Sequence, residues 1–148
     1  MGRVPRTSLP DGAFHVYVRG VAGSTPFPED DDKDTMMRLI PSVEWRQGLI
    51  LHVACVMSTH YHAVVEGTAD ALSAAMHWLN WAYARYFNEQ YGRYGHVFAE
   101  RFNTRVAEGE DGLRRASEYV LDNPVKAGLC HRREDWPWSY SRYGFDVG

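Results

Sequence analysis

The stretch LILHVACVMSTHYHAVVE, residues 49–66, contains two apolar runs separated by the short polar pair Ser58-Thr59. The first run extends over Leu49–Met57 and is interrupted by His52, and the second extends over Tyr61–Glu66. Both runs have the length of a strand rather than of a helix. The stretch therefore predicts a β-hairpin that is buried on at least one face.

The segments that precede this hairpin predict one strand and one helix. The run Ala13–Arg19 is short, rich in β-branched and aromatic residues and bounded by Asp11-Gly12 and Gly20, which is typical of a strand. A helix is expected over 30–47, because three aspartates supply its N-cap and first-turn acids and apolar residues recur along it. Pro41 is expected to kink or split this helix.

The segments that follow the hairpin predict two further helices with a strand between them. Apolar residues recur every three or four positions over Ala69–Tyr91, which indicates the longest helix of the chain. Alternating residues over 96–107 predict a strand. A last helix is expected over Glu110–Asn123, where Pro124 would end it.

The order of these elements is strand, helix, strand, strand, helix, strand, helix. It predicts an α+β protein of the ferredoxin-like split βαβ (RRM-like) type. We expect an antiparallel sheet with helices on one face, plus one extra C-terminal helix. A chain of 148 residues suffices for one such domain over 1–148, with a core of its own.

Composition indicates a globular protein, with 45% hydrophobic and 24% charged residues. No apolar run reaches the roughly 18 residues needed to span a bilayer, and residues 1–12 lack the apolar core of a signal peptide. We therefore expect a cytoplasmic protein that does not contact a membrane. Cys55 and Cys130 form no CxxC pair and are expected to be free thiols.

The formal net charge of −3 argues against an overall basic surface, which nucleic-acid-binding domains usually carry. Local clustering is the alternative, because many of the basic residues lie in the second half of the chain. If the fold brings them to one face they form a basic stripe, and otherwise they belong to a mixed, solvated surface. The candidates for contacts with a polyanion are Arg19, Arg85, Arg101, Arg105, Arg115 and Lys126.

The second strand of the hairpin begins with a pair of histidines. Because side chains alternate along a strand, His60 and His62 share one face while Tyr61 points to the other. Two neutral imidazoles one strand pitch apart are able to chelate one metal ion. An isolated pair of this kind is equally compatible with exposed or hydrogen-bonded histidines, so the pair alone leaves both interpretations open.

A second candidate group lies on the last predicted helix. Tyr119 and Asn123 stand four residues apart and therefore lie on one side of that helix. They border its expected buried stripe, so the phenol would reach both the core edge and solvent. That stripe centres on Leu113, Ala116, Ser117 and Val120. Most of the other tyrosines, such as Tyr83, Tyr86 and Tyr91, are expected to be packing residues with a hydrogen-bonded hydroxyl.

Five motifs follow one another between about Arg6 and Tyr143. They are FHVYVRG (14–20), CVMSTHYHAVVE (55–66), AMHWLNWAYARYFNEQYGRYGHVFAERF (75–102), EYVLDNPVKAGL (118–129) and DWPWS (135–139). In this order they resemble the tyrosine transposases of the insertion-sequence 200/605 type, which carry a His-hydrophobic-His motif. The resemblance is strongest to their REP-associated branch.

This resemblance implies a metal-dependent single-stranded DNA endonuclease and strand-transferase that acts through a 5′-phosphotyrosine. His60 and His62 match the metal-binding histidines, Tyr119 matches the nucleophile on a catalytic helix, and Asn123 matches the amide that completes the metal site. Two imidazole nitrogens and one amide oxygen suit Mg²⁺ or Mn²⁺. The implied partner is single-stranded or hairpin DNA.

Three other functions remain open at this point. A non-catalytic module that binds single-stranded nucleic acid would need no metal. A metal-dependent hydrolase of small phosphate esters would use the histidines and leave Tyr119 and Asn123 unexplained. A domesticated relative would process repeated DNA without moving itself. The sequence also leaves open whether the protein is a monomer or a homodimer.

Overall fold

A computed structural model describes residues 11–99 and 101–145. The expected strand over 96–107 crosses residue 100, which lies outside the described residues. Both ends of the domain expected over 1–148 lie outside them as well.

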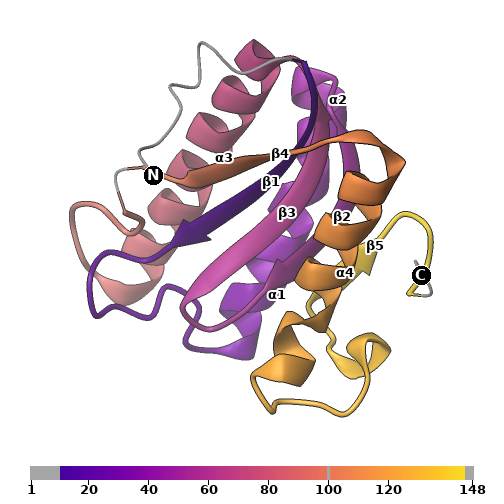
Figure 1. The fold of residues 1–148 in the computed structure, drawn as a ribbon. Coiled ribbons are helices and arrows are strands. Elements are labelled where there is room, and N and C mark those ends of the chain that lie inside the picture. The colour runs from indigo at the N-terminus through magenta and orange to yellow at the C-terminus, as the bar shows by residue number, and fades with distance from the viewer. Residues whose placement is uncertain (1–10, 100, 146–148) are drawn as a thin grey trace.

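The structure is built around a five-stranded antiparallel sheet with the order β4-β1-β3-β2-β5 (Figure 1). The strands are β1 (Gly12–Arg19), β2 (Ile50–Val56), β3 (His60–Gly67), β4 (Asn103–Ala107) and β5 (Ser139–Ser141). The order of the first four strands is that of the split βαβ fold, so the predicted fold class is confirmed. The predicted hairpin is formed by β2 and β3.

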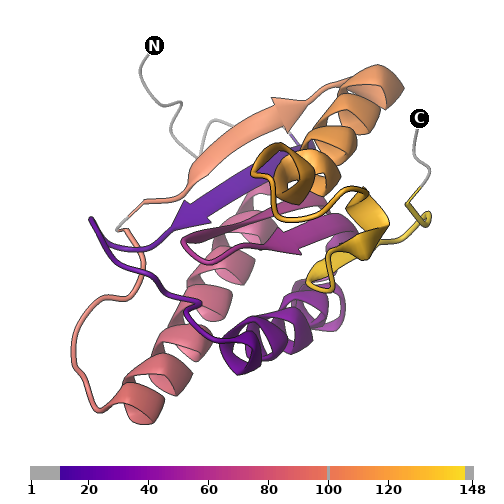
Figure 2. The same ribbon diagram turned by 90° about the horizontal axis from the view of Figure 1, so that it is seen from below.

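Helices cover both faces of this sheet (Figures 1 and 2). One face is covered by α1 (Asp30–Leu39), the 3₁₀ turn η2 (Ile40–Ser42), α2 (Val43–Gln47) and α3 (Ala69–Tyr91). The first three of these elements are the helix expected over 30–47, split around Pro41 as predicted. The extra helix α4 (Gly109–Lys126) crosses the opposite face, over β2 and β3.

Alternation along the strands separates two apolar cores. The larger core lies between the sheet and α1 to α3, and it contains the fully buried Phe14, Val16 and Val18 of β1. The smaller core lies under α4, where Val120 and Leu121 pack against residues of β2 and β3. The other side of β1 faces the side of the sheet that α4 crosses, so its residues stand beside that helix.

Two predicted boundaries were wrong. The strand expected over 96–107 is restricted to β4, because Phe98 only bridges Gly20 and in a register that differs from the β1–β4 ladder. Pro124 does not end the last helix, which continues to Lys126. Pro124 lies in the final turn, where a proline forfeits one backbone hydrogen bond, and its buried ring packs inside the protein.

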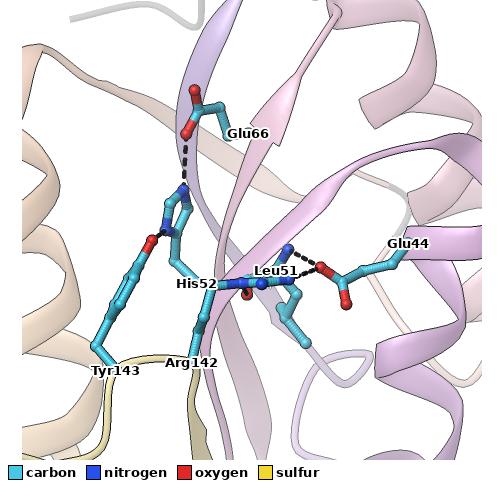
Figure 3. Close-up of polar contacts among 6 residues, drawn as sticks. All are labelled: Glu44, Leu51, His52, Glu66, Arg142 and Tyr143. Atoms are coloured by element: carbon cyan, nitrogen blue, oxygen red, sulfur yellow. Dashed lines mark hydrogen bonds and ion pairs between the residues drawn. The ribbon is translucent and has the colours of Figure 1, made fainter.

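The C-terminal segment adds β5 to the edge of the sheet, which the sequence did not predict (Figure 1). His52 of β2 lies between Glu66 and Tyr143, with its Nε2 2.8 Å from Glu66 Oε1 and its Nδ1 2.8 Å from the Tyr143 hydroxyl (Figure 3). Arg142 forms an ion pair with Glu44 beside this contact. These bonds engage the Tyr143 phenol at the end of β3 that is remote from His60.

Two compositional expectations concern the membrane and the cysteines. None of the helices within the described residues combines the length and the apolar character needed to cross a membrane. Both cysteines are free thiols, as predicted: Cys55 is buried beneath α4 and Cys130 is partly exposed.

Candidate active site

The two histidines at the start of β3 point to the face of the sheet that α4 crosses. Their ring centroids lie 4.9 Å apart. Between them, Tyr61 points into the larger core and donates a hydrogen bond of 2.7 Å from its hydroxyl to Asn80 Oδ1. The predicted alternation of His60, Tyr61 and His62 is therefore confirmed.

Helix α4 brings Tyr119 and Asn123 to these histidines. Asn123 Nδ2 lies 3.2 Å from His62 Nε2, and the ring centroids of Tyr119 and His62 lie 5.8 Å apart. Val120 anchors this turn in the smaller core, whereas Tyr119 is 47% exposed. The helix-border position predicted for Tyr119 is thus confirmed, and all four candidate side chains meet within one chain.

Two further residues of this site, His15 and Tyr17 on β1, were missed from the sequence. His15 Nε2 lies 3.0 Å from His62 Nδ1. The Tyr17 ring centroid lies 5.0 Å from that of His60 and 4.8 Å from that of His62. The sequence feature that could have identified them is the alternation in β1, where polar residues on one face follow apolar residues such as Phe14 on the other. The pairing of β1 with β3 sets Tyr17 directly across from His62.

Burial keeps these imidazoles neutral at neutral pH. It lowers the pKa of His62 to about 3, and the neighbouring His60 and His15 act in the same direction. Burial likewise lowers the pKa of His15 to about 4, with a further contribution from Arg105. The pKa of His60 is lowered mainly by burial. Neutral imidazole is the protonation state in which a histidine can bind a metal ion.

The candidate donors for a metal ion are two imidazoles and one amide. Within 11–99 and 101–145, no three histidine, cysteine, aspartate or glutamate side chains form a group that could itself hold a metal ion. The third candidate donor beside His60 and His62 is the amide of Asn123, which places its nitrogen toward His62 and also carries an oxygen. Nitrogen and amide-oxygen donors fit a divalent ion that accepts mixed ligands, such as Mn²⁺ or Mg²⁺.

Four of the basic candidates lie around this site. In the strand register, Arg19 of β1 lies opposite His60 of β3, and Arg105 of β4 lies opposite His15 of β1. Arg115 lies one helical turn before Tyr119. On the other side of Tyr119, Lys126 Nζ stands 5.2 Å from the centroid of its ring. These four residues lie on the elements that carry the site, and Lys126 contacts the Tyr119 ring directly.

Two basic candidates are placed differently. Arg85 lies on α3, across the sheet from the site, where its guanidinium forms an ion pair of 3.4 Å with Glu89. Arg101 is exposed in the segment before β4. The fold therefore gathers part of the expected basic set and leaves Arg85 apart from it.

Most other tyrosines are engaged in the structure. The hydroxyl of Tyr83 donates to Pro26 O at 2.5 Å. Tyr86 and Tyr91 donate to the carboxylate of Asp32 at 2.7 and 2.5 Å. The predicted hydroxyl bonds are confirmed for all three, but the predicted packing role holds only for Tyr83 and Tyr86, because Tyr91 is 42% exposed. Tyr119 and Tyr17 are the two tyrosines whose rings contact the histidine pair.

Acidification is expected to destabilise the fold through His15 and His62. Their pKa values in the folded state lie below the ordinary 6.5, so below pH 6.5 the unfolded chain binds protons that the folded chain does not. The free energy of unfolding should therefore fall as the pH drops from about 6.5 to about 4, by up to about 1.4 kcal/mol per pH unit per histidine.

Urea unfolding across this pH window measures the effect. Carboxylates titrate in the lower part of the window, so the matched control is the double variant His15→Gln/His62→Gln. It should show a shallower dependence on pH than the wild type. Equal slopes in the two proteins would contradict the assignment of buried neutral imidazoles.

The class of protein follows from the fold and the site together. A split βαβ sheet with a histidine pair on one face, crossed by a helix that carries a tyrosine, fits the tyrosine transposases that the sequence resembles. A model of the family described as "Transposase IS200 like" matches residues 22–123. This match covers more than half of the chain, so the chain belongs to the IS200-like transposase family.

A solved structure has a similar fold. It is described as the structure of a REP-associated tyrosine transposase bound to a REP hairpin, and it superposes with a TM-score of 0.72 at 21% identity. The match covers 94% of this chain and 82% of the other. No curated protein matches the sequence. The family match includes His60, His62, Tyr119 and Asn123, whereas His15 and Tyr17 precede it.

Proposed function

We propose that this transposase cuts and rejoins single-stranded DNA, with Tyr119 as the nucleophile and with a divalent metal ion held by His60, His62 and Asn123. The observation that supports this most is their convergence within one chain. A half-exposed phenol stands 5.8 Å, ring to ring, from a buried neutral imidazole that contacts the Asn123 amide.

The proposed substrate is single-stranded DNA beside a hairpin. The protein of similar fold is described as bound to a REP hairpin, which makes hairpin DNA the first substrate to test. Arg19, Arg105, Arg115 and Lys126 would supply contacts to phosphates around the phenol.

The reaction is a transesterification in two directions. The Tyr119 oxygen attacks phosphorus, the Oη–P bond forms, and the bond from phosphorus to the 3′ oxygen breaks. The phenol proton leaves to solvent, and the departing 3′ oxygen takes up a proton to become a free hydroxyl. A 3′-hydroxyl of another strand can reverse these steps and join to the 5′-phosphate, without ATP, because the phosphotyrosine retains the energy of the phosphodiester.

The residues around Tyr119 have distinct tasks in this scheme. A bound Mg²⁺ or Mn²⁺ would polarise the scissile phosphate and stabilise the charge that develops on it. His60, His62 and Asn123 would hold that ion from one side of the site. Lys126, beside the Tyr119 ring, would hold a phosphate within reach of the phenol.

The test is cleavage of a labelled hairpin-bearing oligonucleotide with Mn²⁺ present. We expect a shortened product with a free 3′-hydroxyl, and no product after treatment with a chelator. Full activity in the chelator-treated enzyme would contradict the proposal that cleavage requires a divalent metal ion. Binding without cleavage under any metal condition would instead favour a non-catalytic binding module.

The salt dependence of DNA binding is expected to report the basic residues around the site. Each neutralised phosphate of a single strand contributes about 0.7 to the slope of log affinity against log salt. Lys126→Ala should reduce that slope by about one such increment if Lys126 neutralises one phosphate.

Arg85→Ala is the matched control, because Arg85 lies across the sheet from the site. The slope of log affinity against log salt for Arg85→Ala should equal that of the wild type in filter-binding or fluorescence titrations. A wild-type affinity that does not change with salt would show that no such basic surface operates.

A further inference from the structure

We infer that His15 is a positioning residue of this site, which fixes the tautomer and the orientation of His62 so that Nε2 of His62 faces Asn123. This inference rests on the proposed function, because it assigns the purpose of that orientation to the metal. His15 lies on β1, outside the region that the family model matches. His15 therefore belongs neither to the histidine pair of β3 nor to the residues that the family model matches.

Both ring nitrogens of His62 have a partner. The Asn123 amide donates from Nδ2 to His62 Nε2 over 3.2 Å, so Nε2 presents its lone pair. A neutral imidazole has one ring proton, which must then lie on Nδ1 of His62. That proton is donated to Nε2 of His15 at 3.0 Å. The contact with His15 thus favours the tautomer whose Nε2 carries the lone pair, which could bind a metal ion in place of the Asn123 hydrogen bond.

The rings around His62 also fix its orientation. His62 is 2% exposed, and the His15 ring lies beside it with centroids 5.2 Å apart and planes inclined by 27°. The Tyr17 ring contacts His62 as well, with a centroid distance of 4.8 Å. A flat ring held by two neighbouring rings and by hydrogen bonds at both nitrogens has little freedom to turn.

His15 contacts the nucleophile as well as the histidine. Its ring meets Tyr119 edge to face, with centroids 5.5 Å apart and planes inclined by 61°. One side chain on β1 therefore touches a proposed ligand on β3 and the proposed nucleophile on α4. An apolar residue at position 15 would keep the packing with Tyr119 but would leave the Nδ1 proton of His62 without its acceptor.

The test compares His15→Phe with His15→Gln. Phenylalanine keeps a ring but cannot accept a proton, whereas the glutamine side chain carries an amide oxygen that can. We expect His15→Phe to weaken Mn²⁺ binding, measured by calorimetry, by about 10- to 100-fold. His15→Gln should bind Mn²⁺ close to the wild-type affinity. A merely structural role for His15 would not separate the two variants in this way at equal thermal stability.

A second readout does not depend on the metal. Nitrogen-15 spectra of the metal-free protein report which ring nitrogen of His62 carries the proton. We expect the Nδ1-protonated form in the wild type and in His15→Gln, and a mixture of tautomers in His15→Phe. His15→Leu replaces the phenylalanine variant if that variant does not fold.

The outcomes distinguish this inference from the proposed function. If the wild type binds no Mn²⁺, the metal proposal fails, and the tautomer measurement still decides whether His15 fixes His62. If the wild type binds Mn²⁺ and the phenylalanine or leucine variant matches it in affinity and in tautomer, the inference about His15 is overturned.

Discussion

Replacing Tyr119 with phenylalanine is expected to abolish DNA cleavage, with a loss of about a thousandfold or more. The substitution removes the oxygen that would form the bond to phosphorus, and removal of a nucleophile typically costs at least this factor. Binding of the oligonucleotide and the unfolding temperature should change little. The phenylalanine ring keeps its contacts with His15 and His62, and the deleted atom belongs to a side chain that is 47% exposed.

Tyr17→Phe is the matched control for this variant. Tyr17 is the other tyrosine whose ring lies against the histidine pair, but it is partly buried on β1 rather than exposed on α4. We expect it to retain cleavage in a single-turnover assay with a labelled hairpin oligonucleotide. Cleavage at the wild-type rate by Tyr119→Phe would exclude Tyr119 as the nucleophile, and loss of cleavage only in Tyr17→Phe would move the nucleophile to β1.

Replacing His62 with alanine is expected to remove Mn²⁺-dependent cleavage. Stabilisation of a phosphoryl transition state by a metal ion is worth several kcal/mol, and about 4 kcal/mol corresponds to roughly a thousandfold in rate. His62 is the most central of the proposed ligands, since it contacts His15, Asn123 and the Tyr119 ring. Calorimetric titration with Mn²⁺ should show the loss of binding directly.

Because His62 is buried, its truncation leaves a cavity, and thermal unfolding must accompany the assay. The companion variant is His60→Ala, whose side chain is only partly buried and whose removal disturbs the core less. It should lose Mn²⁺ binding as well while the protein stays folded. Normal Mn²⁺ binding and cleavage in a folded His60→Ala protein would rule out the histidine pair as the metal site.

The sequence predicted those parts of the fold that depend on local periodicity. The two apolar runs over 49–66 have the length of strands, and the structure pairs them as β2 and β3. The alternation His60-Tyr61-His62 and the four-residue spacing of Tyr119 and Asn123 fix which side chains share a face of a strand or helix. These local rules hold because backbone geometry sets them, whatever packs around the element.

The features that the sequence missed depend on tertiary contacts. The pairing of β5 with β2 rests on three residues and on contacts such as the ion pair of Arg142 with Glu44, which no local pattern announces. Helix α4 continues through Pro124 because the ring is buried, which outweighs the preference of proline to end a helix.

The candidate site was missed in part for the same reason. His15 and Tyr17 alternate with apolar residues in β1, but their place beside His62 follows from the order of strands in the sheet. The position of the basic residues could not be predicted from the net charge either. The net charge of −3 gives no sign of a basic surface, whereas the fold gathers Arg105 and Lys126 near Tyr119.

The most direct test of the proposed chemistry is mass spectrometry of the covalent intermediate. The enzyme is incubated with a labelled hairpin oligonucleotide and Mn²⁺, denatured, and digested with trypsin. Trypsin cuts after Arg115 and after Lys126, so Tyr119 falls in its own peptide, separate from those of Tyr17 and Tyr143. We predict a DNA-linked peptide spanning 116–126. An adduct on the peptide of Tyr17, Tyr140 or Tyr143, or cleavage without any adduct, would contradict Tyr119 as the nucleophile.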